Sequence, residues 1–300
     1  TPSSYTTGRV LFESGSAVTD SSTFTFANSK LTAPIFNASG ASTTVITYNN
    51  ANLLVASSSR NIIALGIGAR INATSTANDS FFVGNSAGLN ATGAANSNFL
   101  GYNAGKDAVG AANSNFLGIN AGNGGTSASF SNFIGYNAGA DSATSSSYSN
   151  FFGFRAGDGA VAAHDSNFFG SYAGYGTKGA YKSNFLGYQT GDGATNAYYA
   201  NFFGVNAGIN ATAAHDSNFM GQSAGNTATN AAYSNFLGFG AGFHATNAAR
   251  SIFLGYYSGI NDTVNNASST ASTSIAIGQY AGTGGFSDSI ALGHGVKNSA

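Results

Sequence analysis

The chain of 300 residues contains no cysteine, no tryptophan and only two prolines. Without cysteine it has neither a disulfide framework nor a thiolate metal site. Charged residues make up only 7% of the sequence and the formal net charge is -1, which disfavours nucleic acid and polybasic membrane surfaces as partners. No apolar run approaches the roughly 20 residues of a membrane span, so we expect no membrane insertion by this chain. Because it begins at Thr1 with no apolar leader, we expect any export signal or anchor to lie outside it.

Glycine and aromatic residues are abundant, with 42 Gly, 24 Phe and 15 Tyr. Each phenylalanine is a large apolar surface that favours burial, so this composition differs from the low-hydrophobicity signature of disorder. We therefore expect the chain to fold.

A nine-residue pattern, SNFLGYNAG at 97–105, recurs along the chain with small variations, and weaker copies stand at 61–66, 274–278 and 289–293. In the regular run its first glycine recurs every 17 residues, with a single spacing of 18. We interpret these residues as turn glycines, because a turn that leaves a flat coil needs φ > 0 or a close backbone approach. They are Gly84, Gly101, Gly118, Gly135, Gly153, Gly170, Gly187, Gly204, Gly221, Gly238 and Gly255.

Seventeen residues are too few for most paired-helix repeats, and the Gly, Asn, Thr and aromatic content opposes helix. The sequence therefore predicts an all-β fold, a parallel β-solenoid (β-roll) of about 14 coils with a 17-residue period. In the coil that begins at Ser97 we expect a strand at 98–100, a turn at 102–105 and a second short strand at 108–111. Coils would stack about 4.8 Å apart. The longer spacing over 256–273 indicates a loop that bulges from an intact coil.

Two regions are expected. Residues 1–60 alternate apolar and polar residues over short runs, which predicts irregular β structure that serves as an N-terminal cap or connector. Residues 61–300 form the β-solenoid repeat domain.

Consecutive bulky residues in each predicted strand point to opposite faces, so one lies inside the coil and the next lies outside it. We expect the first set to form the core of the repeats: Phe82, Phe99, Phe116, Phe133, Phe151, Phe168, Phe185, Phe202, Phe219, Phe236 and Phe253. The second set are candidates for subunit contact: Leu100, Leu117, Ile134, Phe152, Phe169, Leu186, Phe203, Leu237 and Leu254. An exposed stripe of this length exceeds what a soluble monomer tolerates. A homotrimer would cover it symmetrically, and a second sheet of the same chain is the alternative.

Asparagines recur at two further offsets. Asn98 and its equivalents predict a ladder of side-chain amides along the stack, and Asn103 suits a left-handed turn.

The segments 274–278, 289–293 and 294–300 resemble the head repeats of trimeric autotransporter adhesins (YadA-like β-roll repeats). That resemblance implies a trimeric left-handed β-roll on a bacterial surface that binds host matrix or other cells. Residues 8–12, 22–26 and 30–33 resemble the segment that precedes the repeats in phage tail fibres. Together the two resemblances imply an extracellular protein of a cell surface or a virion.

Catalytic and metal-binding patterns are weak. Asp158 and Asp192 share an offset but lie two coils apart, and the pairs His164-Asp165 and His215-Asp216 lie three coils apart. Calcium-binding β-rolls repeat their Asp in nearly every coil, whereas most coils here lack it. We therefore predict no enzyme, no catalytic, cofactor-binding or metal-binding residues, and no cofactor.

The sequence favours a non-enzymatic structural fibre or adhesin shaft whose partners are copies of itself, with a cell-surface or glycan receptor at its turns. Exposed aromatics at the turns would either stack on sugars or pack between coils; they are Tyr102, Tyr136, Tyr188, Tyr256 and Tyr257. A subunit of a head-to-tail filament is the second hypothesis. Ice binding is a third, since Ala-Thr steps at Thr92, Thr195, Thr212, Thr229 and Thr246 supply part of a regular threonine array.

Overall fold

The computed structural model describes the backbone of residues 9–14, 17–27, 30–32, 44–48, 51–57, 60–70, 77–140, 144–263, 273–286 and 288–298, and the side chains within these ranges from Leu54 onward. The chain forms two compact units, residues 1–44 and residues 45–300, and each is described by itself. The described residues form strands and turns, and they contain no helix that could cross a membrane.

The first unit contains a three-stranded antiparallel sheet in the order β1-β2-β3. Its strands are β1 (Arg9–Ser14), β2 (Ala17–Ala27) and β3 (Lys30–Thr32). The register of β1 against β2 shifts between Arg9 and Val10.

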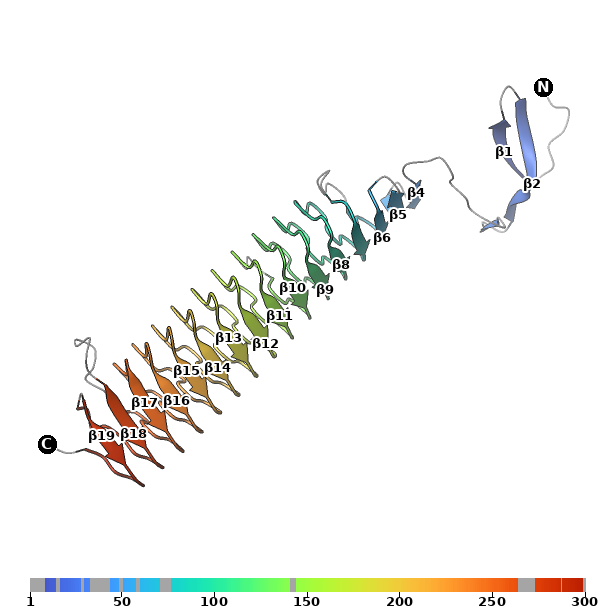
Figure 1. The fold of residues 1–300 in the computed structure, drawn as a ribbon. Helices are drawn as coiled ribbons and strands as arrows, with labels where there is room; N and C mark the ends of the chain where they lie inside the picture. Colours follow the sequence, from blue (N-terminus) through green and yellow to red (C-terminus); the bar gives the residue numbers. More distant parts are fainter. Residues whose placement is uncertain are drawn as a thin grey trace. The chain divides into compact units, whose positions relative to one another are not determined.

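The second unit is a stack of coils, each of which contributes one short strand to a single long sheet (Figure 1). The strands β6 to β19 pair with their neighbours in parallel. The predicted all-β parallel solenoid with its 17-residue period is confirmed. These strands are β6 (Ile62–Leu65), β7 (Ser80–Val83), β8 (Asn98–Leu100), β9 (Asn115–Leu117), β10 (Asn132–Ile134), β11 (Asn150–Phe152), β12 (Asn167–Phe169), β13 (Asn184–Leu186), β14 (Asn201–Phe203), β15 (Asn218–Met220), β16 (Asn235–Leu237), β17 (Ser251–Leu254), β18 (Ser274–Ile277) and β19 (Ile290–Leu292).

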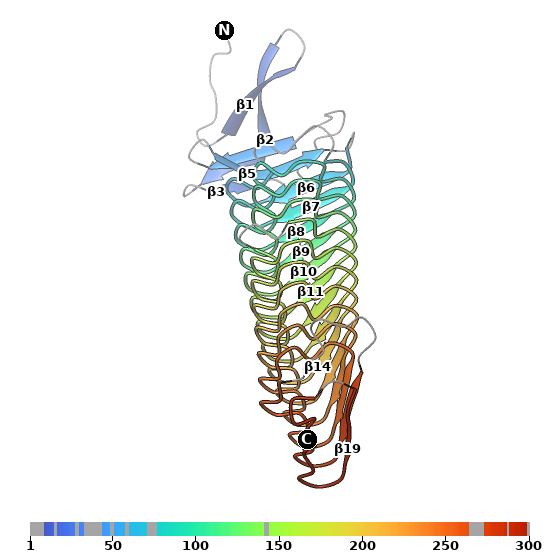
Figure 2. The ribbon, with the colours of Figure 1, turned by 90° about the vertical axis from the view of Figure 1, so that its left-hand side faces the viewer.

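Seen from the second direction, the strands of successive coils lie above one another on one side of the stack, and turns close the coils on the other side (Figure 2). Equivalent residues of neighbouring coils pair with each other, since Phe99 pairs with Phe116 and Leu100 with Leu117. The long spacing after Gly255 does not break this order, because Ser251 of β17 still pairs with Ser274 of β18. The predicted bulging loop itself falls largely on 264–272, outside the described residues.

At the other end of the sheet, β4 (Thr44–Tyr48) and β5 (Ala51–Ser57) extend the order beyond β6. Strand β5 runs antiparallel to β6, with Leu54 opposite Leu65. An exposed strand edge is a template for unwanted pairing, so this reversal covers the edge that β6 would otherwise present.

The second short strand predicted at 108–111 is wrong in extent, because only one residue per coil bridges there. Val109 pairs with Thr92 on one side and Thr126 on the other as isolated parallel bridges. The residues around it are left-handed, with φ of 56° at Asp107 and 64° at Gly110. An extended strand cannot propagate through such positions.

The interior is a column of phenylalanine rings bordered by alanines. The eleven predicted core phenylalanines are each 0% exposed. Most neighbouring rings stack at 4.7–5.0 Å between centroids, but Phe168 and Phe185 meet at 5.3 Å with their planes 62° apart. The change of orientation coincides with Thr190, which takes the place of the alanine found five residues after most of the other phenylalanines. The column is therefore two parallel stacks joined by one edge contact.

Glycine is required at two positions of each coil. A Cβ on Gly101, where φ is +139°, would lie 2.4 Å from the carbonyl oxygen of Gly118 in the next coil. A Cβ on Gly105 would lie 2.3 Å from Cδ1 of Phe99. The first glycine therefore lets coils approach, and the second leaves room for the ring.

A buried serine ladder links the coils beside the phenylalanines. The hydroxyl of Ser97 donates to the carbonyl oxygen of Ala111 at 2.6 Å, and its oxygen accepts the backbone N–H of Ser114 at 3.1 Å. The pattern repeats at the serines that open the copies from Ser80 to Ser234; Ser183, for example, donates to Ala197 and accepts the backbone N–H of Ala200. These bonds satisfy backbone groups that the short strands leave without ladder partners.

Candidate functional site

The outward side chains of the strands form one file along the sheet. We call it the outer file; it contains the nine predicted contact residues, Met220 between Phe203 and Leu237, and Leu65, Val83, Ile277 and Leu292 at the two ends. These side chains are half-buried or exposed, with Leu254 at 42%. Buried and outward side chains therefore alternate along the strand as predicted, since buried Phe253 precedes exposed Leu254.

A second apolar file runs beside the outer file, one residue beyond the first turn glycine. We call it the tyrosine file. Eight of its members are 43–53% exposed, and only polar residues such as Ser171 and Gln222 interrupt the run. Its apolar members are Ile67, Tyr102, Ile119, Tyr136, Phe154, Tyr188, Val205, Phe239 and Tyr256.

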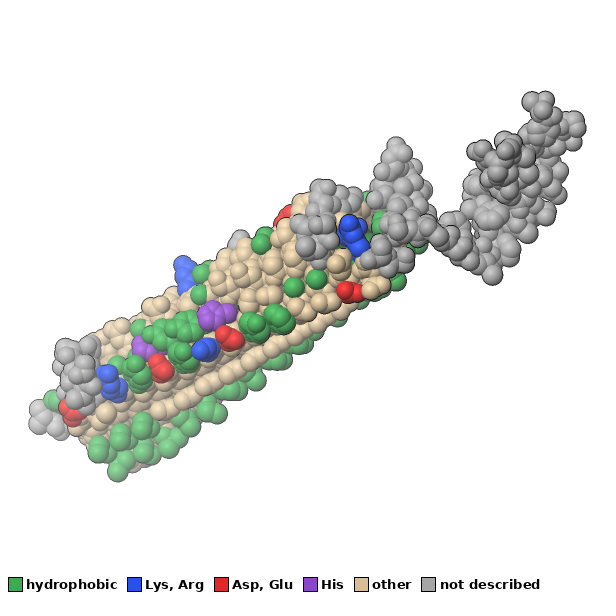
Figure 3. Space-filling model, turned by 45° about the horizontal axis from the view of Figure 1, so that its top comes forward, with side chains coloured by type: hydrophobic (Ala, Val, Ile, Leu, Met, Phe, Trp, Pro, Cys, Tyr) green, Lys and Arg blue, Asp and Glu red, His purple; other side chains and the backbone are tan. Residues whose placement is uncertain are grey.

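The outer file and the tyrosine file together are called the apolar face below. Figure 3 shows hydrophobic side chains gathered along one edge of the stack. Four tyrosines of the second file were singled out from the sequence, but Ile119, Phe154 and Val205 were missed because only tyrosines were considered at this offset. The signal was available in the 17-residue offsets.

The predicted amide ladder is present next to the outer file. Each Nδ2 donates to Oδ1 of the asparagine in the next coil, from Asn98 to Asn235, at 2.7–2.9 Å. It ends where Ile252 replaces asparagine. Asn103 has φ of 53°, the left-handed turn expected for it, and donates to Asn120 at 3.2 Å. Both ladders tie coil to coil and fix the spacing of the outward files.

Asp158 and Asp192, which share an offset in coils two apart, lie in different environments. Asp158 is buried and accepts from Nε of Arg155 at 2.8 Å, and this bond raises the pKa of Arg155. The guanidinium of Arg155 also lies 4.7 Å from the ring centroid of Tyr175. Burial raises the pKa of Asp192, whose neighbours in the same column are Tyr175 and Ile209. Neither carboxylate belongs to a cluster of three metal-ligating side chains in the part of the chain that is described.

Two His-Asp pairs are formed within the repeats. Nδ1 of His164 lies 2.9 Å from Oδ2 of Asp165, and His215 holds Asp216 at the same distance. The pairs remain three coils apart, as the sequence indicated, so they do not converge on one substrate atom.

The threonines of the Ala-Thr steps form one file through the isolated bridges, on the outside of the coil. The file is not regular, since Val109, Val161 and Lys178 interrupt it. Its threonines are Thr92, Thr126, Thr144, Thr195, Thr212, Thr229, Thr246 and Thr263. A single interrupted file gives order to water along one dimension only, which is less than the flat array that the ice-binding hypothesis requires.

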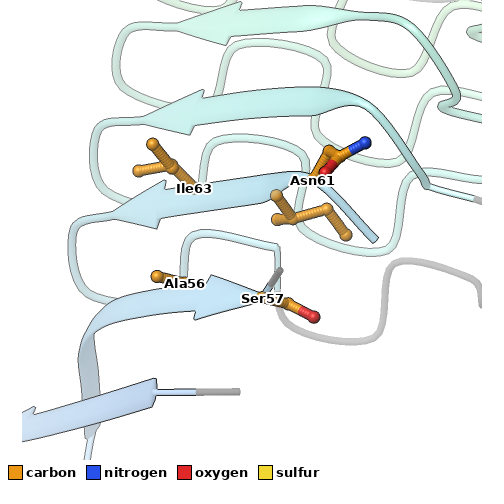
Figure 4. A pocket seen from close by; sticks show the side chains of 5 residues that line it. Ala56, Ser57, Asn61 and Ile63 are labelled. Atoms are coloured by element: carbon orange, nitrogen blue, oxygen red, sulfur yellow. The ribbon is translucent and has the colours of Figure 1, made fainter. Parts of the chain in front are cut away.

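A cavity of ≈ 400 Å³ lies where β5 meets β6 (Figure 4). Its lining is Ala56, Ser57, Asn61, Ile62 and Ile63, with no titratable side chain. The amide of Asn61 donates to Asp79 at 2.7 Å. The cavity therefore lacks the paired acids and bases that hydrolytic chemistry needs.

No protein-family model matches the chain, and no curated protein matches its sequence.

Proposed function

We propose that this chain is a non-enzymatic structural protein, the shaft of an extracellular fibre or adhesin, whose copies associate side by side through the apolar face. The observation that carries the proposal is the pair of apolar files on the outside of the coils, of which the outer file is apolar in every coil from Leu65 to Leu292. A soluble monomer rarely exposes a contiguous apolar patch above a few hundred Å². Burial of the same two files in every coil makes association cooperative along the whole length.

A homotrimer is the assembly we favour. Three copies around an axis parallel to the stack would each place the outer file at the centre, and closed symmetry leaves no copy with an uncovered face. The resemblance of 274–300 to trimeric adhesin heads supports this arrangement, as does the single parallel strand that each coil contributes.

The contacts between successive coils support a mechanical role. Rings, serine hydroxyls and asparagine amides all bond or stack from one coil to the next, so the stack resists bending and local opening. The titratable side chains are dispersed over many coils, and the His and Asp pairs are bonded within themselves. This arrangement supports a structural role better than a hydrolytic one. We place the protein at a cell surface or on a virion, where a rigid shaft carries a receptor-binding end.

The test is the mass of the particle in solution. Sedimentation equilibrium of the wild type is expected to give three times the mass of 30.0 kDa, independent of concentration. Replacing Leu117 and Leu186 by Asp buries two charges in the proposed interface and is expected to yield monomers with an unchanged circular dichroism spectrum. Lys178→Asp, an outward change in the threonine file, is the matched control and should remain trimeric.

A wild-type monomer whose apolar face is open to solvent would refute the proposal. Particles that lengthen with concentration would favour the head-to-tail filament instead.

A further inference from the structure

A second outward surface lies on the coil just before each strand, on the far side of the asparagine ladder from the outer file. Its inner row is His164, Tyr181, Tyr198 and His215, one ring per coil. The three successive centroid distances are 5.1, 4.9 and 4.6 Å, with planes 4–8° apart. We call this row, together with Asp165, Lys182, Tyr199, Asp216, Tyr233 and Arg250 at the next position of successive coils, the aromatic platform. Figure 3 shows a band of His, acidic, basic and hydrophobic side chains that is separate from the apolar edge.

The ring planes of two platform tyrosines are nearly perpendicular to the rings of the inner row. The plane of Tyr199 stands at 77° to Tyr181 and 80° to Tyr198, and Tyr233 stands at 84° to His215. Because the inner rings face one another along the stack, the planes of Tyr199 and Tyr233 run lengthwise along it. Both are about half exposed, at 45% and 51%. A ligand that lies along the stack would therefore run parallel to the planes of both rings.

The spacing of the two rings is set by the fold. Tyr199, Asp216 and Tyr233 occupy the same position of three successive coils. The two rings are thus separated by two ladder steps, about 10 Å, with a carboxylate between them.

Hydrogen-bonding groups surround both rings. Lys182 Nζ lies 5.4 Å from the centroid of Tyr199, and the guanidinium of Arg250 lies 5.4 Å from that of Tyr233. Each imidazole is held through Nδ1 by its own aspartate, which leaves Nε2 of His164 and His215 pointing away from that bond. The charges of Asp165 and Asp216 balance those of Lys182 and Arg250. The platform therefore has no excess of positive charge that would select a polyanion.

We propose that the aromatic platform binds an extended, neutral β-1,4-linked polysaccharide that lies along the stack. In such a chain successive sugars turn over, so the same face recurs at every second sugar, at about the distance of two coils. Alternate sugars stack on Tyr199 and Tyr233, and Asp216 accepts a hydroxyl of the sugar between them. Lys182 and Arg250 donate to hydroxyls at either end. An α-linked glucan coils and cannot keep this register with a straight row of rings.

This inference goes beyond the proposed function and does not rest on it, because the asparagine ladder separates the platform from the apolar face. Assembly and polysaccharide binding are therefore measured independently. Loss of one leaves the other intact.

The experiment measures depletion of the full chain from solution by crystalline cellulose and chitin, with starch and dextran as α-linked controls, and calorimetry with cellohexaose and chitohexaose. Binding to a β-1,4-linked polymer is expected, and Tyr199→Ala should weaken it by about tenfold or more, since aromatic anchors dominate binding sites of this kind. Tyr148→Ala is the matched control. Tyr148 stands in the same column and is 58% exposed, but its ring is parallel to Phe130 at 4.9 Å. It should bind as the wild type does.

Absence of binding to both β-1,4-linked polymers, equal binding to the α-linked ones, or an equal loss in Tyr148→Ala would each overturn the proposal. The wild type supplies a second readout that needs no variant. Bound hexasaccharide should slow the carbethoxylation of His164 and His215, while His244 and His294 react at their usual rate. Equal reaction of all four histidines in the presence of saturating hexasaccharide would contradict the placement of the site.

Discussion

The serine ladder has one gap, and filling it should stabilise the chain. Ala200 opens its copy of the repeat where the preceding and following copies have Ser183 and Ser217. In the other coils from Ser80 to Ser234 the serine hydroxyl donates to a carbonyl 14 or 15 residues later and accepts the backbone N–H of the residue that opens the next copy. With alanine in that place, neither the carbonyl of Ala214 nor the N–H of Ser217 has a hydrogen-bond partner among the described residues. Ala200→Ser restores both bonds.

The size of the effect follows from the two groups involved. A net intramolecular hydrogen bond contributes about 0.5–1.5 kcal/mol, and a buried backbone group without a partner costs about 1–3 kcal/mol. Space is not limiting, because the same oxygen fits at the equivalent place in neighbouring coils. We therefore expect Ala200→Ser to raise the free energy of unfolding by about 1–2 kcal/mol.

Native-state hydrogen exchange is the assay, because a stack of repeats need not unfold in a single step. In the wild type the amide of Ser217 should exchange faster than that of Ser234, and in Ala200→Ser the two should become equal. Denaturant unfolding of the same pair supplies the free energy.

The control is the same substitution at another buried alanine. Ala197→Ser puts a hydroxyl into the column that contains Ser146, whose Oγ is buried without a partner. It should destabilise the chain by about 1–3 kcal/mol. An Ala200→Ser variant that is no more stable than the wild type, or that leaves Ser217 unprotected, would show that the ladder does not stabilise the coils.

Three further changes test other parts of the stack. Gly204→Ala should lower the free energy of unfolding by about 2 kcal/mol or more, since at φ of +129° its Cβ would lie 2.7 Å from the carbonyl oxygen of the next coil. Gly176→Ala is the control and should cost about 1 kcal/mol, because its Cβ would meet no atom within 4 Å. Equal costs in denaturant unfolding would argue against a close approach of the coils at Gly204. Phe202→Ala should destabilise the chain by about 3–5 kcal/mol, because it leaves a cavity in the ring column. Phe203→Ala should change the stability of the isolated chain far less, but it should weaken association in sedimentation. The reverse order would contradict the assignment of the buried and outward faces. Burial raises the pKa of Asp192 above its ordinary value of 3.8, so its contribution is most favourable at low pH and is lost as the pH rises through the raised pKa. Asp192→Asn should therefore melt at a higher temperature than the wild type at pH 7, and the difference should shrink as the pH falls through the raised pKa and be smallest below 3.8; a difference independent of pH would exclude this cause.

The period and the alternation of large side chains were enough to predict the stack. Phe99 beside Leu100, repeated every 17 residues, indicated a strand with one buried and one outward face, and the asparagine at position 98 indicated its ladder. These features depend only on spacing and on the period-2 geometry of a strand.

Features that depend on backbone conformation were harder to predict. The second strand was predicted too long because Asp107 adopts a left-handed conformation that its residue type does not require. The aromatic platform was missed for another reason. Its positions hold Ala, Ser, His or Tyr in different coils, and only the alignment of His164 with Tyr181 and Tyr198 in successive coils reveals a row.

Because each coil contacts only its neighbours, the number of coils sets the length of the stack. Each coil ends in the geometry with which the next begins, so gain or loss of one 17-residue unit moves the tip by a single ladder step, about 4.8 Å. Unequal recombination between such similar copies would thus produce a graded set of lengths from one template. Selection would be able to set the length of the stack in small steps without redesigning any coil.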